Sequence, residues 1–182
     1  MEFIRANKNA YGGTRPLSDI KYIVIHYTSG DKDTALNEAN YFANGNTRKA
    51  GAHFFVDQNG VRIKSVAMKN IAWSVGGAKY SDCAKTGGGK LYGKCTNANS
   101  VSIELCGNLK RDPSDEQIES VKKVINYIRK NCPNAKTIVR HFDVTGKYCP
   151  VRMMEQKKWD DFLIRIGEKN ARSTSKQSKK TK

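Results

Sequence analysis

Two short apolar runs rich in β-branched residues each lead into a histidine. Residues 23–25 read Ile-Val-Ile and are followed by His26, while residues 137–139 read Thr-Ile-Val and precede Arg140 and His141. Continuous runs of this kind predict buried β-strands. Loops that follow strands often carry function, because a rigid sheet holds their side chains in place. The two histidines are therefore predicted at strand ends, although each one taken alone would more often be a hydrogen-bonded core residue.

The segment after the second run adds an ammonium group and a thiol, from Lys147 and Cys149. Neutral imidazole and thiolate are ligand types that zinc prefers. A set of His26, His141 and Cys149 would leave one tetrahedral position open, as in catalytic zinc sites. The sequence thus predicts a hydrolase with one Zn²⁺ ion, which would polarise a carbonyl group and lower the pKa of water to roughly 7. Cys149 alone would indicate only an inert buried thiol.

Hydrolysis also needs a proton acceptor and a group that stabilises the oxyanion. Glu104 is the acid inside the apolar strand predicted for residues 100–106, which makes it the candidate general base. Its alternative is a glutamate on the solvent face of an edge strand. Lys147, two residues before Cys149, is the candidate for the oxyanion, and its alternative is an ordinary surface lysine.

Strand and helix signals alternate irregularly along the chain. This mixture predicts an α/β domain with a mixed sheet of about five strands covered by about three helices. Gln58-Asn59-Gly60 between two apolar runs predicts a β-hairpin. A capping box of Ser114 with Gln117 predicts that a helix begins after Ser114. The expected order is an irregular segment (1–19), a strand (20–27), a helix (33–44), a hairpin (53–57 and 61–65), a strand (100–106), a helix (114–131), a strand (137–141) and a helix (152–167).

Residues 66–99 form the least regular part of the chain, and they include Trp73, six glycines, two tyrosines and five lysines. A loop of this length in a compact domain is uncommon and usually functional. We expect it to line a groove in which Trp73 contacts the substrate. The alternative is a flexible surface insertion, with Trp73 as a core plug.

Four blocks of sequence together resemble one family. They are residues 23–28 (Ile-Val-Ile-His-Tyr-Thr), 51–57 (Gly-Ala-His-Phe-Phe-Val-Asp), 101–107 (Val-Ser-Ile-Glu-Leu-Cys-Gly) and 140–150, which begins Arg-His-Phe-Asp and ends Lys-Tyr-Cys-Pro. In content and order they look like the zinc-dependent N-acetylmuramoyl-L-alanine amidases of the type-2 amidase family, which includes phage endolysins, bacterial autolysins and peptidoglycan recognition proteins. The resemblance covers about residues 20–166. It implies that fold and a peptidoglycan hydrolase, which cleaves the amide between the lactyl group of N-acetylmuramic acid and the L-alanine of the stem peptide.

The resemblance also implies roles for single residues. The zinc ligands of the family would fall on His26, His141 and Cys149, and its oxyanion-stabilising lysine would fall on Lys147. Binding-only recognition proteins typically lack the cysteine ligand.

One position departs from part of the family. In some members, a tyrosine just before the histidine of the Gly-x-His-Phe block assists catalysis. The corresponding residue of this chain is Ala52. Other members use a glutamate on the Ile-Glu-Leu strand, which is Glu104 in this chain, so the departure favours Glu104. His53 is expected on the wall of the site, and its alternative is a core histidine.

The formal net charge of +16 favours polyanionic partners. Residues 171–182 contribute five of these charges and no acid, so the body of the chain is basic as well. We expect the basic surface to attract anionic wall polymers. The scattered lysines and the lack of RNP, KH and C-x-x-C patterns argue against a specific nucleic-acid binder. The H-x-E and P-C-x-x-C signature of zinc deaminases is also missing.

One catalytic domain is expected over residues 1–170, followed by a basic disordered tail or the start of a linker at 171–182. No apolar run approaches the length of a membrane span, and the polar N-terminus lacks the apolar core of a signal peptide. We therefore expect a monomer that is made in the cytoplasm without a signal peptide and acts on the bacterial cell wall. A phage lysin is favoured over a host autolysin.

Two other functions stay open from the sequence. One is a non-catalytic peptidoglycan-binding module of the same fold. The other is a cysteine hydrolase with Cys149 as nucleophile and His141 as base. The odd number of cysteines argues against a disulfide framework, although Cys83 and Cys95 lie in one glycine-rich stretch and could pair if oxidised.

Overall fold

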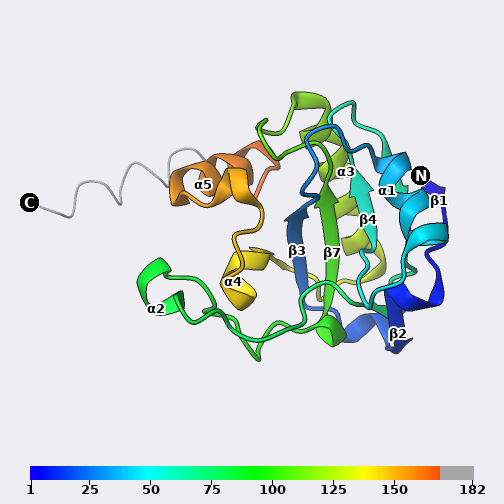
Figure 1. Ribbon diagram of the computed structural model, residues 1–182, viewed down its shortest axis with the longest axis horizontal. Coiled ribbons are helices and arrows are strands. Elements are labelled where there is room, and N and C mark those ends of the chain that lie inside the picture. The colour runs from blue at the N-terminus through cyan, green and yellow to red at the C-terminus, as the bar shows by residue number, and fades with distance from the viewer. Residues whose placement is uncertain (169–182) are drawn as a thin grey trace, which may run out of the picture.

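A six-stranded sheet runs through residues 1–168, the part of the chain that the computed structural model describes (Figure 1). Its strand order is β1-β5-β4-β7-β3-β8, and all neighbours are parallel except the antiparallel pair β4 and β5. A separate antiparallel pair joins β2 and β6. The bounds are β1 (Glu2–Phe3), β2 (Tyr11–Thr14), β3 (Tyr22–Tyr27), β4 (Phe54–Val56), β5 (Arg62–Lys64), β6 (Asn70–Ala72), β7 (Ser100–Leu105) and β8 (Thr137–Arg140).

Within residues 1–168, five α-helices accompany the sheet. They are α1 (Ala35–Asn40), α2 (Cys83–Thr86), α3 (Asp115–Asn131), α4 (His141–Thr145) and α5 (Gln156–Arg165). A π-helical turn, Tyr41–Gly45, continues α1, and single 3₁₀ turns lie at Lys8–Ala10, Leu17–Asp19, Asn97–Asn99 and Val151–Met153. The Ser114 hydroxyl accepts a hydrogen bond from the backbone N–H of Gln117 at 3.0 Å. That cap fixes the start of α3 where the sequence predicts it.

Both faces of the central strands are covered, which explains their continuous apolar sequences. On one face, Ile25, Ile103 and neighbouring strand residues pack against the apolar sides of α3 and α5 in the largest core cluster. Figure 1 shows α3 lying behind the large sheet. On the other face, Phe55 packs with α1, and Val24 packs with Val144 of α4. The sheet is therefore a buried middle layer that can hold side chains firmly at its ends.

The structure confirms the mixed α/β fold with helices over a sheet, and the hairpin at residues 58–60 appears as β4 and β5. The prediction that residues 1–19 are irregular is wrong, because β1 adds a sixth strand at one edge and β2 pairs with β6. Strands of two to four residues carry too little pattern to be detected without their partners.

Three further expectations meet the structure differently. The predicted tail at residues 171–182 lies outside the described residues. Cys83 and Cys95 are free, buried thiols. Within residues 1–168, none of the helices combines the length and the apolar character that a membrane crossing requires.

Candidate active site

The pairing of parallel strands brings the predicted residues to one edge of the sheet. His26 near the end of β3 is in register with Glu104 near the end of β7. On the other side of β3, Ile25 is paired with Arg140 of β8, so His141 follows at the level of His26. Residues in register on neighbouring strands point to the same face. Three segments that are distant in sequence therefore present functional side chains at the carboxyl ends of adjacent strands, where ligands bind in open α/β sheets.

A tight return of the chain brings Cys149 to the same place. Gly146 ends α4 with a φ of 89°, a left-handed conformation that glycine adopts without steric cost. The chain then folds back, and the backbone N–H of Phe142 donates a hydrogen bond to the carbonyl oxygen of Cys149 at 2.9 Å. This bond holds the cysteine beside the helix that begins with His141.

Arg140 fixes the start of α4. Its backbone N–H donates to Oδ2 of Asp143 at 2.8 Å, and its guanidinium Nη2 donates to Oδ1 at 2.7 Å. The guanidinium also donates to the carbonyl oxygen of Met153 at 3.0 Å. It lies 5.1 Å from the ring centre of Phe142 and 5.4 Å from that of Trp159. This buried cation is paired on its charged edge and stacked on its faces, so it anchors the segment that carries His141.

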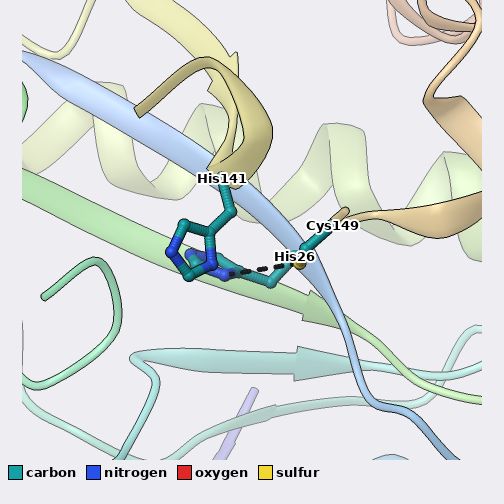
Figure 2. Close-up of side chains that lie close together, drawn as sticks. All are labelled: His26, His141 and Cys149. Carbon is teal, nitrogen blue, oxygen red and sulfur yellow. Dashed lines mark hydrogen bonds between the residues drawn. The ribbon is translucent and has the colours of Figure 1, made fainter. Parts of the chain in front are cut away.

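His26, His141 and Cys149 converge (Figure 2). Their candidate ligand atoms lie within 4.8 Å of one another, Cys149 Sγ is 3.8 Å from His26 Nδ1, and the imidazole centres are 4.6 Å apart. All three residues are buried, with exposed fractions of 2%, 5% and 2%. His26 Nε2 and His141 Nδ1 have no hydrogen-bond partner among the described residues. Unpaired buried nitrogens are rare in folded proteins, and a cation held beside Cys149 and His26 Nδ1 would satisfy the unpaired Nδ1 of His141.

Burial sets the protonation of the three side chains. It lowers the pKa of His26 well below its usual value, and His141 and Lys147 act in the same direction. It also lowers the pKa of His141 to about 3, again with a contribution from Lys147. Burial raises the pKa of the Cys149 thiol, and the nearby Glu104 adds to the rise. Neutral imidazoles keep lone pairs for a metal, and a bound cation is what would turn the thiol into a thiolate.

Glu104 lies beside the ligand set. Its Oε1 is 4.0 Å from His26 Nδ1, and its side chain is 19% exposed. Its other oxygen, Oε2, is buried and has no hydrogen-bond partner among residues 1–168. Burial raises the pKa of Glu104 to about 8, while Lys147 opposes this rise and Glu38 adds to it. Because β7 is an inner strand, the alternative of a glutamate on an edge strand does not apply.

The site opens into a cleft with two branches that meet beside His141. One branch, of about 480 Å³, is lined by His26, Glu104 and Cys149 and also by Asp33 and Glu38. We call it the acidic branch. The second branch, of about 680 Å³, is lined by Lys49, Lys79 and Lys147, and we call it the lysine branch. The residues common to both are Trp73, Ser74, His141 and Lys147.

Lys147 and Trp73 therefore lie where the branches join. Lys147 is exposed, and its charge depresses the pKa of both His26 and His141. Trp73 is partly exposed, and its ring covers Gly12, where an added Cβ would lie 2.5 Å from the ring. The tryptophan is thus both packed on the N-terminal segment and open to the cleft. Its contact with substrate stays a prediction.

The structure places His53 away from the cleft. Its side chain has no exposed surface, and it is not among the residues that line either branch. The backbone N–H of Ser102 donates to Nδ1 at 3.1 Å, which leaves Nε2 to donate to the carbonyl oxygen of Asn70 at 3.2 Å. Burial, followed by the charge of Arg15, lowers its pKa to about 3. These contacts match the core-histidine alternative, and the neighbouring Ala52 is buried as well.

Two acidic side chains in the cleft had no part in the sequence prediction. Asp33 and Glu38 lie in the segment that follows β3, which the sequence identified only as a helix. Their position in the sequence could have indicated them, because the loop after the carboxyl end of a parallel strand commonly faces a ligand.

Comparisons with known proteins agree with this geometry. The family model described as N-acetylmuramoyl-L-alanine amidase (Amidase_2) matches residues 16–152. The chain is 30% identical over 148 residues to the N-acetylmuramoyl-L-alanine amidase XlyB of Bacillus subtilis (strain 168), and the aligned region covers 80% of this chain and 42% of XlyB. It is 29% identical over 196 residues to the amidase CwlL of Bacillus licheniformis, which covers 98% of this chain and 51% of CwlL. The chain thus spans about half the length of these curated relatives.

Solved structures show the same fold. PlyL superposes with a TM-score of 0.70 at 21% identity, over 93% of this chain and 99% of PlyL. The catalytic domain of XlyA superposes with a TM-score of 0.66 at 22% identity, over 92% of this chain and 100% of that domain. Since the family model spans β3 to the loop beyond Cys149 and so includes the whole predicted ligand set, this chain belongs to the N-acetylmuramoyl-L-alanine amidase family.

Proposed function

We propose that this chain is the zinc-dependent catalytic domain of a peptidoglycan hydrolase. It cleaves the amide bond between the lactyl group of N-acetylmuramic acid and the L-alanine of the stem peptide. The observation that carries the proposal is the convergence of His26, His141 and Cys149 in a cleft beside Glu104. Two imidazoles and a thiolate form a three-ligand set of the kind found at catalytic zinc sites.

His26, His141 and Cys149 would hold the ion. A tetrahedral zinc with ordinary bond lengths sets a sulfur and a nitrogen ligand about 3.6 Å apart, close to the 3.8 Å between Cys149 Sγ and His26 Nδ1. The unpaired, buried Nδ1 of His141 supports the same assignment. When bound, zinc polarises the substrate carbonyl and makes water acidic enough to react near neutral pH.

Glu104 acts as the general base and acid. Its carboxylate takes a proton from the attacking water, whose oxygen forms the new bond to the carbonyl carbon. It then returns the proton to the alanine nitrogen as the carbon–nitrogen bond breaks. Burial raises the pKa of Glu104 to about 8, and Lys147 lowers it. Positive charge at the ligand set acts in the same direction as Lys147 and favours the ionised base.

Lys147 stabilises the negative charge that develops on the carbonyl oxygen. It lines the cleft at the junction of the branches, and a cationic donor at such a point stabilises an oxyanion more than the ground-state carbonyl. Glu104 and Lys147 thus divide the chemistry between proton transfer and charge stabilisation.

The alternative of a cysteine hydrolase has less support. Burial raises the pKa of the Cys149 thiol and lowers the pKa of His141, the candidate base, to about 3. A nucleophilic cysteine needs the opposite, a thiolate stabilised by a protonated histidine. The arrangement therefore favours a sulfur that binds a cation over one that attacks substrate.

Further parts of the proposal concern the whole protein. The domain acts on the bacterial cell wall, as an endolysin would, and its basic surface adds a salt-sensitive attraction to anionic wall polymers. We take the domain to be a monomer. The strong excess of basic residues supports the wall attraction, and membership of the N-acetylmuramoyl-L-alanine amidase family supports the place of action.

The test combines metal analysis with digestion of purified peptidoglycan. We expect about one zinc per chain and release of new amino termini on alanine, with loss of activity after chelation and recovery with added zinc. Intact, bound wall fragments without cleavage would point to a binding module instead. Activity that survives chelation but is lost on thiol alkylation would assign the reaction to Cys149.

A further inference from the structure

The two branches of the cleft differ in charge. Lys49, Lys79 and Lys147 line the lysine branch, and no acidic side chain is among the described residues that line it. Within residues 1–168, neither Lys49 nor Lys79 takes part in an ion pair. Their charges are therefore not neutralised by the protein. A concave surface with charge of one sign concentrates the opposite charge within it.

The acidic branch has a different balance of charge. Three acids, Asp33, Glu38 and Glu104, line it together with two cations, Arg48 and Lys147. Burial, followed by repulsion from Asp33, raises the pKa of Glu38 to about 7. Tyr41 and Phe42 add aromatic surface to the same branch. With three acids and two cations, this branch attracts an anion less than the lysine branch does, whereas its aromatic rings suit the apolar faces of uncharged groups such as sugars.

The place where the branches meet indicates that each branch holds a different half of the substrate. His26, Glu104 and Cys149 line the acidic branch, and His141 and Lys147 line both branches. The reacting bond of a substrate therefore lies at the end of the acidic branch that adjoins the lysine branch. On the proposed function, that bond joins an uncharged sugar unit to a peptide that carries carboxylates. The two halves of the substrate then leave the junction along different branches.

We propose that the lysine branch binds a carboxylate of the stem peptide through Lys49 and Lys79, and that the sugar occupies the acidic branch. The proposal rests on the proposed amidase function and adds a specificity to it. The chain would prefer stem peptides with a free carboxylate next to the alanine over peptides in which that group is amidated. Because both lysines are near solvent, the preference is electrostatic and weakens with salt.

Two small synthetic substrates test this. They are N-acetylmuramoyl-L-alanyl-D-glutamyl peptides whose glutamyl α-carboxyl group is either free or amidated. We expect kcat/KM to be about tenfold higher for the free acid, as two partly exposed lysine–carboxylate pairs would give. In the double variant Lys49→Met, Lys79→Met, the ratio should fall to within about twofold. The matched control is Lys85→Met, on α2 and outside both branches, which should keep the wild-type ratio.

The outcomes separate this inference from the function beneath it. If wild-type protein cleaves neither substrate, the amidase function itself fails. If it cleaves both at equal rates, or if the double variant loses the same factor on both, the carboxylate assignment is overturned while the amidase function stands. A ratio that shrinks with added salt in the wild type, and does not change with salt in the double variant, would support the assignment.

Discussion

Glu104 lies beside His26 because the two residues are partners in the parallel pairing of β3 with β7. Their closest side-chain atoms are 4.0 Å apart, yet 78 positions separate them in sequence. At the residue scale, this register gives the carboxylate two properties that a base needs. It is next to the ligand set, and burial raises its pKa to about 8. Neither property requires Glu104 to bind the metal itself.

Replacing Glu104 by glutamine tests that separation. Glu104→Gln should lower kcat about 100-fold or more, the usual size of a lost acid–base group, while zinc content stays at the wild-type level. Digestion of peptidoglycan and metal analysis on the same preparation measure the two quantities. Glu119→Gln, an exposed change on α3, is the control. Full activity in Glu104→Gln would remove this residue from the mechanism.

Lys147 gives a second prediction at this scale. Lys147→Met should reduce kcat by about 100-fold, the typical cost of one oxyanion donor, with zinc retained because the ligand atoms are unchanged. Lys85→Met serves as the control for the loss of one lysine. An effect confined to KM would instead make Lys147 a residue of substrate binding.

At the scale of elements, α4 connects two of the three ligands. Gly146 ends this helix with φ of 89°, and a Cβ at this position would overlap Cys83 Sγ. Gly146→Ala should therefore destabilise the fold by about 2 kcal/mol and lower activity, since the segment to Cys149 must shift. Chemical denaturation and a wall-digestion assay measure both effects.

The control for that change is another left-handed glycine. Gly93 has φ of 74° and open space around its would-be Cβ. Gly93→Ala should show only the cost of the conformation, about 1 kcal/mol, with activity preserved. Equal losses in the two variants would mean that the contact with Cys83 has no part in holding the loop.

The elements also show what the sequence could predict. The strands that carry His26 and Glu104, and the strand that precedes His141, are long enough for their apolar runs to identify them. By contrast, β1, β2 and β6 exist through pairing with distant partners. The branches of the cleft were not predictable either, because they combine residues from β3, α1, the loop around Lys79 and α4. His53 could not be assigned, since its burial depends on Arg15 and Asn70.

At the scale of the whole molecule, His53 links stability to pH. Its folded-state pKa is about 3, below the ordinary value of 6.5. The unfolded chain therefore takes up a proton near pH 6.5, while the folded chain does not until about pH 3. Stability from this residue is present above pH 6.5 and is lost as the pH falls through this range, by about 3 kcal/mol between pH 6.5 and 4.

Comparison with His53→Gln isolates this effect from the other histidines. A glutamine can offer one acceptor and one donor to Ser102 and Asn70 but does not titrate. Denaturation curves at pH 7, 5.5 and 4 should show a smaller loss of unfolding free energy with acid in the variant than in the wild type. Identical pH slopes for the two proteins would contradict the assignment.

Metal removal is the last prediction at this scale. A ligand that binds only the folded state stabilises it by an amount that grows with its concentration, about 4 kcal/mol at a thousandfold excess over Kd. We expect chelation to lower the melting temperature and added zinc to restore it. His26→Ala, which removes one ligand, should melt at the same temperature with and without chelator.

The three proposed ligands come together only late in folding, when the strands of the central sheet have docked. Cys149 and His26 are 123 positions apart, and β3 lies between β7 and β8, so no single hairpin or helix within residues 1–168 brings the three proposed ligands together. Capture of the ion must then wait until these strands have docked in order. The rate at which zinc passes from a coloured indicator to the refolding protein would therefore report when the central sheet is complete.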